Sequence, residues 1–214
     1  MNSPIKKLPA PTQSFMEEIG VKSERTQIKT TTHIVFEKLV KEYLLRENKT
    51  PVIVDIGAGK GLNVKNLESQ NIPVIAIEPF ANPKVWLNRK PDYQYSTEAP
   101  SEIADLIFNS YVLNVVPPDI AEVILKDIYR ILKPKGQALI FVRNINDVET
   151  NCKAYLHPEH GELSWGVGHK VTSNLTYQRG FTYKTLFELI HSCCSFSNIE
   201  RFSTKSGLAV LVTK

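Results

Sequence analysis

Two acidic residues that directly follow or end apolar runs are the strongest candidates for ligand binding in this chain. The stretch PVIVDIGAGKGLNVKNL, residues 51–67, predicts a strand that ends near Asp55, a turn with three glycines and then a helix. Such a turn exposes backbone N–H groups and can bind a ligand at the helix N-terminus. Glu78 ends the apolar run of VIAIEPF, 23 residues after Asp55, at the offset where an acidic residue binds ribose hydroxyls.

The residues of this turn argue against two of the usual ligands, although a nicotinamide-dependent oxidoreductase stays open as a further alternative. A nucleoside triphosphate loop needs Ser or Thr after the lysine, but Leu62 follows Gly59-Lys60-Gly61. A dinucleotide turn needs G-x-G-x-x-G, and the third glycine falls at Gly61 instead of position 62. Asp55 would also repel a pyrophosphate, whereas it would attract a cation. S-adenosylmethionine carries a sulfonium and an α-ammonium group and no phosphate, so the residues favour it.

Strands and helices alternate along the chain and predict the scaffold that positions these residues. Continuous apolar runs are typical of parallel strands covered on both faces; the expected strands are 52–56, 74–77, 105–110, 138–143, 197–202 and 208–212. Four-residue apolar spacing predicts helices within 33–45 and 118–133, and Thr182 is a candidate N-cap for a helix over 182–192. This order predicts an α/β protein with a doubly wound, mostly parallel sheet and an antiparallel C-terminal edge.

The chain reads as one domain preceded by a short arm. Residues 1–25 are proline-containing and are expected to form a flexible arm, and residues 26–214 form the domain. Residues 144–180 are polar and aromatic with weak periodicity, so they are expected to form a long irregular insertion after the strand at 138–143. Such segments are usually functional or disordered. Its position predicts that it covers the acceptor side of the site.

Four motifs occur in an order that resembles a known family. VDIGAGKG, IAIEPF, ADLIFNSYVLNVV and ILKPKGQALIFV lie between residues 51 and 143, and together they resemble the class I S-adenosylmethionine-dependent methyltransferases. The resemblance implies a seven-stranded Rossmann-like sheet and methyl transfer from S-adenosylmethionine. The expected cofactor-binding residues are Asp55, Gly57, Ala58, Gly59, Gly61, Glu78, Pro79, Phe80 and Asn109.

Candidate catalytic residues lie at the end of the strand at 105–110 and in the insertion. Asn109 and Tyr111 could orient a methyl acceptor, with packing in a helix interface as the alternative for Tyr111. Methyl transfer depends mostly on positioning, and a base is needed only if the nucleophile must first lose a proton; His169 is a candidate for that role. The candidate acceptor-binding residues are Arg143, Trp165, Tyr177 and Arg179, with solvated surface arginines as the alternative for the two cations.

The acceptor is open between a small molecule and an exposed nucleobase. NSYVLNVV, ALIFVRN and TYQRGFTYKTLFELI resemble methyltransferases associated with DNA modification and phosphorothioation systems, but NSYV stands where DNA amino-methyltransferases have [DNS]-P-P-[YFW]. Acidic residues outnumber lysines and arginines in 144–180, which favours a compact acceptor over a long polyanion. A protein that binds S-adenosylmethionine without catalysis is the alternative function.

Composition sets the remaining expectations. The net charge of +4 permits a polyanionic partner without arguing for one, and no apolar run approaches the ~20 residues of a membrane span. Three cysteines without C-x-x-C spacing predict free thiols and a cytoplasmic protein. His157 and His160 with Cys152 match no common zinc site, so no metal is expected.

Overall fold

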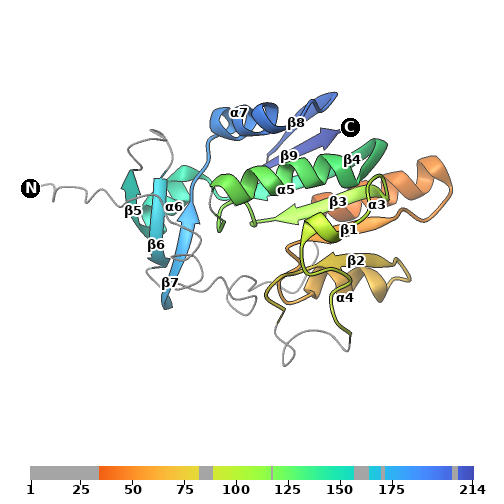
Figure 1. Cartoon of the computed structure of the whole chain (residues 1–214), viewed down its shortest axis with the longest axis horizontal. Coiled ribbons are helices and arrows are strands. Elements are labelled where there is room, and N and C mark those ends of the chain that lie inside the picture. The colour runs from red at the N-terminus through yellow and green to blue at the C-terminus, as the bar shows by residue number, and fades with distance from the viewer. Residues whose placement is uncertain (1–33, 82–88, 117, 157–163, 170–171, 204–206) are drawn as a thin grey trace, which may run out of the picture.

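The computed structural model describes residues 34–81, 89–116, 118–156, 164–169, 172–203 and 207–214 (Figure 1). The expected arm, residues 1–25, lies outside this range, as do the first residues of the expected domain. Within the described ranges, no helix is long and apolar enough to cross a membrane.

A six-stranded sheet forms the centre of the molecule. Its parallel strands are β1 (Ile53–Ile56), β2 (Val74–Ile77), β3 (Ala104–Ser110) and β4 (Leu132–Val142). The strands β8 (Asn198–Ser203) and β9 (Leu208–Thr213) add an antiparallel hairpin, and the order across the sheet is β2-β1-β3-β4-β9-β8. The predicted fold class, doubly wound and mostly parallel with an antiparallel C-terminal edge, is confirmed.

The sheet differs from the expected one at its first edge and in β4. The family resemblance implied seven strands, and the described residues contain six in this sheet; beyond β2 only Tyr93 pairs with Ile77, as a single parallel bridge. β4 begins at Leu132, although the sequence predicted helix up to Lys133-Pro134. The early part of β4 is irregular, with a positive φ at Lys135 and a register shift opposite Ala104–Leu106, so it lacks the alternation that marks a strand.

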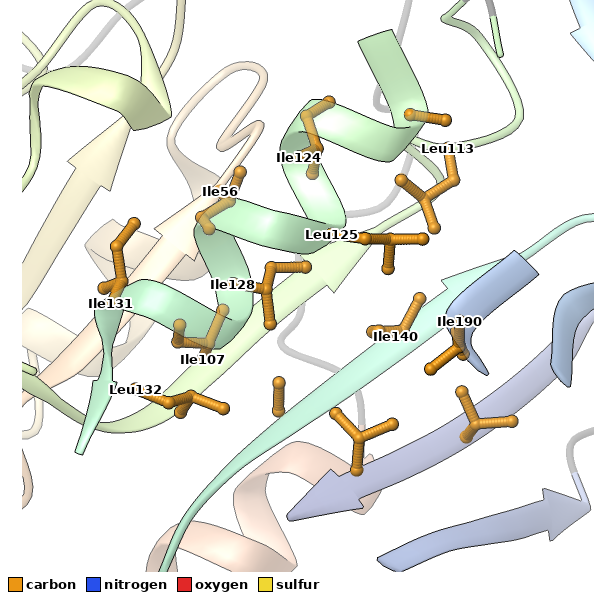
Figure 2. Close-up of a cluster of buried hydrophobic side chains, with 14 of the residues drawn as sticks. Ile56, Ile107, Leu113, Ile124, Leu125, Ile128, Ile131, Leu132, Ile140 and Ile190 are labelled. Carbon is orange, nitrogen blue, oxygen red and sulfur yellow. The ribbon is translucent and has the colours of Figure 1, made fainter. Parts of the chain in front are cut away.

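Helices cover both faces of the central sheet. α5 (Pro118–Ile131) and α7 (Tyr183–Cys193) share one apolar cluster with the sheet, and α3 (Ile34–Glu47) and α4 (Leu62–Glu68) share the other. Figure 2 shows how α5 lies across the strands, with Ile124, Leu125 and Ile128 between the helix and β3. These residues are 9% exposed or less, because their spacing of three or four positions puts them on one side of the helix. A short 3-10 helix, η1 (Ser96–Glu98), precedes β3.

The start of α7 follows the predicted capping pattern. Thr182 is the N-cap, and its hydroxyl accepts a hydrogen bond from the Thr185 backbone N–H at 3.1 Å. Phe181 and Leu186, the expected hydrophobic staple, are both fully buried in the α5 and α7 cluster. α7 therefore begins at a fixed position directly after the insertion.

The expectation that residues 144–180 are irregular is wrong. The segment contains α6 (Ile145–Asn151) and three strands, β5 (Cys152–Leu156), β6 (Ser164–His169) and β7 (Thr172–Arg179). The strands form a separate antiparallel sheet in the order β5-β6-β7. Their sequences show neither the continuous apolar runs nor the helical spacing on which the prediction had relied: β5 contains Lys153 among apolar residues, and β7 begins with three polar residues.

This second sheet lies beyond the carboxyl ends of the central parallel strands (Figure 1). Backbone hydrogen bonds at the end of β7 connect it to the central part of the fold. The Arg179 N–H donates to the Asn114 carbonyl, in the connection between β3 and α5, at 2.7 Å, and the Phe181 N–H donates to the Arg143 carbonyl, just after β4, at 2.9 Å. Ligands of open α/β sheets bind at this carboxyl edge. The fold therefore brings β5–β7 to the edge where the sequence predicted a site.

Candidate active site

The turn between β1 and α4 depends on its glycines. Gly57, Gly59 and Gly61 have φ values of 76°, 58° and 71°, in the left-handed region that other residues adopt at a cost. The N–H groups of Gly57 and Ala58 both donate to the Ile77 carbonyl, at 2.8 and 3.1 Å, and the Gly61 N–H donates to the Ala58 carbonyl at 2.8 Å. The turn is therefore fixed to the end of β2.

Gly57 also meets a second turn at close range. A Cβ atom built on Gly57 would overlap Cγ2 of Val112, in the connection between β3 and α5. Tyr111, which precedes Val112, has a φ of 59°, so an unusual backbone conformation directs Val112 toward the glycine. Sequence reasoning missed this contact because a valine after a strand carries no signal of its own.

Asp55 is a buried carboxylate at the carboxyl end of β1. It is 2% exposed, and its Oδ2 has no hydrogen-bond partner among the described residues. Burial raises the pKa of Asp55 to about 7; a hydrogen bond with Asn63 opposes this shift, and the nearby Glu78 carboxylate adds to it. The ionised Asp55 carboxylate is unfavourable in this buried position, and a bound cation would stabilise it.

Glu78 lies beside Asp55 and holds the turn. It is 7% exposed; its Oε2 accepts a hydrogen bond from the Gly59 N–H at 2.6 Å, and its Oε1 accepts one from the Phe80 N–H at 2.9 Å. Burial raises the pKa of Glu78, and these two backbone bonds oppose the shift. Neither carboxylate forms an ion pair within the described part of the chain.

Pro79 and Phe80 directly follow Glu78 and are more exposed than the Asp55 and Glu78 carboxylates. Pro79 is half-buried, and the Phe80 side chain is 49% exposed although its backbone is fixed by Glu78. A flat, exposed ring next to the Glu78 carboxylate suits the adenine role that the sequence predicted for Phe80, and that role stays a prediction.

Asn109 lies at the carboxyl end of β3 and faces the start of the glycine turn. It is completely buried, and its Nδ2 donates to the Ile56 carbonyl at 3.1 Å. Its Oδ1 has no hydrogen-bond donor among the residues the structure describes. The amide is thus held in one orientation with an unsatisfied acceptor atom. The structure places Asn109 against the turn, as expected for a residue near a bound cofactor.

Tyr111 packs toward the other side of β4. Its ring is 6.3 Å from that of Phe141, and its hydroxyl lies so close to Gly207 that a Cβ there would be 3.2 Å from it. These contacts are with β4 and with the turn between β8 and β9, and not with a helix, so the acceptor role of Tyr111 stays a prediction. Asp105, at the opposite end of β3, accepts hydrogen bonds from the Val52 N–H and Lys133 Nζ, both at 2.8 Å, and is structural.

The two arginines predicted to bind an acceptor are both linked to Phe181, Arg143 through its backbone and Arg179 through its side chain. The guanidinium of Arg179 lies 4.6 Å from the Phe181 ring centre, and this arginine is only 4% exposed, so it is not a solvated surface residue. Arg143 follows β4, and its Nε lies 3.5 Å from Asp147 Oδ2. The fold therefore brings both cations to the carboxyl edge of β4.

The other acceptor-side candidates are placed only by their backbones. Trp165 of β6 pairs with Arg179, Tyr177 of β7 pairs with Val167, and His169 pairs with Thr172. The side chains of residues 151–178 lie outside what the structure describes, so these three roles stay predictions. His157 and His160 also lie outside it, and the described residues contain no cluster of His, Cys, Asp and Glu that could hold a metal.

The fold, the glycine turn and the paired carboxylates define a class I S-adenosylmethionine-dependent methyltransferase. The family model described as methyltransferase domain matches residues 30–201, so the chain belongs to that family. No curated protein matches the chain.

Solved methyltransferases share the fold. 1,6-Didemethyltoxoflavin-N1-methyltransferase from Burkholderia thailandensis, solved with 1,6-didemethyltoxoflavin and S-adenosylhomocysteine, is 19% identical over 84% of this chain and 76% of its own, with a TM-score of 0.53. A Methanosarcina mazei methyltransferase is 16% identical over 86% and 96%, with a TM-score of 0.56. An Archaeoglobus fulgidus methyltransferase is 11% identical over 95% and 100%, with a TM-score of 0.57.

Proposed function

We propose that this enzyme transfers the methyl group of S-adenosylmethionine to a nitrogen, oxygen or sulfur atom of a compact acceptor. The observation that carries the proposal is the buried Asp55 carboxylate, whose Oδ2 has no partner among the described residues, directly beside the glycine turn and Glu78. A buried carboxylate of this kind is stabilised by a cationic ligand. It disfavours a ligand that presents a phosphate to the turn.

Three residues around the turn bind different parts of S-adenosylmethionine in this proposal. Asp55 binds the α-ammonium group. Glu78 keeps lone pairs for the ribose hydroxyls, because a carboxylate has about four acceptor positions and two are used by Gly59 and Phe80. The exposed Phe80 ring packs on the adenine.

In this proposal the methyl acceptor lies at the carboxyl ends of β3 and β4. When bound, S-adenosylmethionine supplies an electrophilic methyl group on a positively charged sulfur. Asn109 Oδ1, fixed by the bond from Nδ2 to Ile56, is available to accept a hydrogen bond from the N–H or O–H of the attacking group. Holding the two reactants in contact is the main catalytic contribution. His169 remains the candidate base for an acceptor that must lose a proton.

The test is methyl transfer from labelled S-adenosylmethionine to the DNA, RNA and small-molecule fractions of a cell extract. We expect S-adenosylhomocysteine to form and the label to appear in the small-molecule fraction. Asp55→Asn, with its charge removed, should form little product. If no fraction accepts the label although the protein binds S-adenosylhomocysteine, the chain is a catalytically silent binding protein. Label in DNA or RNA would contradict the compact acceptor.

A further inference from the structure

Arg143 lies at the junction of the central sheet and the insertion, and its backbone is fixed. It directly follows the last residue of β4, Val142. Its carbonyl accepts a hydrogen bond from the Phe181 N–H at 2.9 Å, and the next residues continue this pairing, since the Ile145 N–H donates to the Phe181 carbonyl at 2.9 Å. The guanidinium therefore projects from a rigid point on the acceptor side.

One end of this guanidinium is buried without an acceptor. Nε faces Asp147 Oδ2 at 3.5 Å, but Nη1 is inaccessible to solvent and has no hydrogen-bond partner in the described part of the chain. A buried charged donor without an acceptor is unfavourable. A planar anion such as a carboxylate satisfies a guanidinium best. The Arg143 guanidinium would therefore be stabilised by binding an anion.

Two sources could supply the anion: the acceptor, or the carboxylate of S-adenosylmethionine itself. The strand order β2-β1-β3-β4 places β3 between Asp55 on β1 and Arg143 after β4. Adjacent strands are about 4.8 Å apart, so the two strands are separated by about 10 Å. The ammonium and carboxylate of an amino acid share one carbon atom. If Asp55 binds the ammonium, the carboxylate of the same molecule stays near β1, and the acceptor is the better source.

Building on the proposed function, we propose that the methyl acceptor carries a carboxylate that binds the Arg143 guanidinium, so Arg143 determines acceptor specificity. The buried Arg179, whose guanidinium lies 4.6 Å from the Phe181 ring centre, adds positive charge to the same edge. The carboxylates of Asp55, Glu78 and Asp147 limit this positive charge, so a monoanionic carboxylate is favoured over a phosphate.

The experiment compares benzoate with benzamide, which have the same shape and differ in charge, by calorimetric titration into protein saturated with S-adenosylhomocysteine. We expect the wild type to bind benzoate at least about tenfold more tightly than benzamide, the scale of one charged hydrogen bond. Arg143→Gln should lose this preference, and Arg143→Lys should keep part of it. Arg46→Gln is the matched control, since Arg46 is exposed on α3, and it should behave as the wild type.

S-Adenosylhomocysteine titrations of the same proteins separate the two proposals. The inference requires Arg143→Gln to bind S-adenosylhomocysteine as the wild type does, which also shows that the variant is folded. A loss of that affinity would assign Arg143 to the cofactor carboxylate. Equal binding of benzoate and benzamide by wild type, or tighter binding of phenyl phosphate, would overturn the carboxylate assignment. If the wild type does not bind S-adenosylhomocysteine, the proposed function itself fails.

Discussion

Asp55→Asn is expected to stabilise the ligand-free protein at pH 8 and to remove most of its affinity for S-adenosylhomocysteine. Burial raises the pKa of Asp55 to about 7 from its ordinary value of 3.8. Between these values the folded state binds more protons than the unfolded state, so the contribution of Asp55 to the unfolding free energy falls as pH rises through this window and is lowest above pH 7. Asparagine has a similar shape and no charge, so the variant avoids this loss.

The expected change in the unfolding free energy follows from the pKa shift of Asp55. One pKa unit corresponds to about 1.4 kcal/mol, so the variant should be more stable by about 2–4 kcal/mol at pH 8 and equal to the wild type near pH 3. Urea unfolding followed at both pH values measures this. Glu200→Gln removes an exposed carboxylate on β8 and should change little at either pH. A variant that is less stable than the wild type at pH 8 would show that Asp55 is satisfied in the folded protein.

The effect of Asp55→Asn on the affinity for S-adenosylhomocysteine is measured separately from its effect on stability. Removing one partner of a buried charge pair costs about 2–5 kcal/mol, so the affinity for S-adenosylhomocysteine should fall by about 30-fold or more. In the wild type, affinity should rise as pH increases toward and past 7, because the ionised carboxylate binds the ammonium group. Calorimetry at pH 6 and pH 8 tests both statements. An affinity that does not change with the substitution would remove Asp55 from the site.

Gly57→Ala is expected to disrupt the turn, because its Cβ would overlap Val112 and its φ is 76°. The left-handed conformation costs a residue with a Cβ about 1–2 kcal/mol, and overpacking costs about 1–3 kcal/mol. The unfolding free energy should therefore fall by about 2–5 kcal/mol. S-Adenosylhomocysteine affinity should fall by at least about tenfold, since the displaced turn no longer holds Glu78 through the Gly59 N–H.

A second substitution separates the two causes. Adding Val112→Ala to Gly57→Ala removes the methyl groups that overlap the new Cβ and leaves the φ strain, so the double variant should recover the overpacking part of the loss. Urea unfolding of the two single variants and the double variant gives the coupling energy. Additive effects would mean that Gly57 and Val112 do not contact each other.

The sequence predicted β1, β2, β3 and β9 well because these strands are continuous, mostly buried apolar runs, which are distinctive. β2 was predicted with the bounds observed, and β1, β3 and β9 within one residue at each end. β8, an edge strand with exposed polar residues, was also predicted within one residue at each end. β5–β7 were missed because these short strands contain no long apolar run and lie in a polar segment. The early start of β4 was missed because its pairing to β3 depends on a register shift that tertiary contacts produce.

The candidate site could be predicted where acidic residues stand at the ends of recognisable strands. Asp55 and Glu78 were expected at the same edge, and the structure places them side by side. The buried state of Arg179 and the contact of Val112 with Gly57 had no sequence signal, because both depend on how the insertion and the β3–α5 connection fold onto the sheet. Those tertiary contacts arise between segments far apart in the chain.

Direct calorimetric titration of S-adenosylhomocysteine into the wild-type protein tests the cofactor site. The two buried carboxylates and the glycine turn predict one site per chain with micromolar-range affinity, about −8 kcal/mol, and a rise in the melting temperature with ligand. NADH, which presents a pyrophosphate, should give neither signal. Absence of both binding heat and thermal stabilisation with S-adenosylhomocysteine, or equal binding of NADH, would contradict the assignment of this edge of the sheet to S-adenosylmethionine.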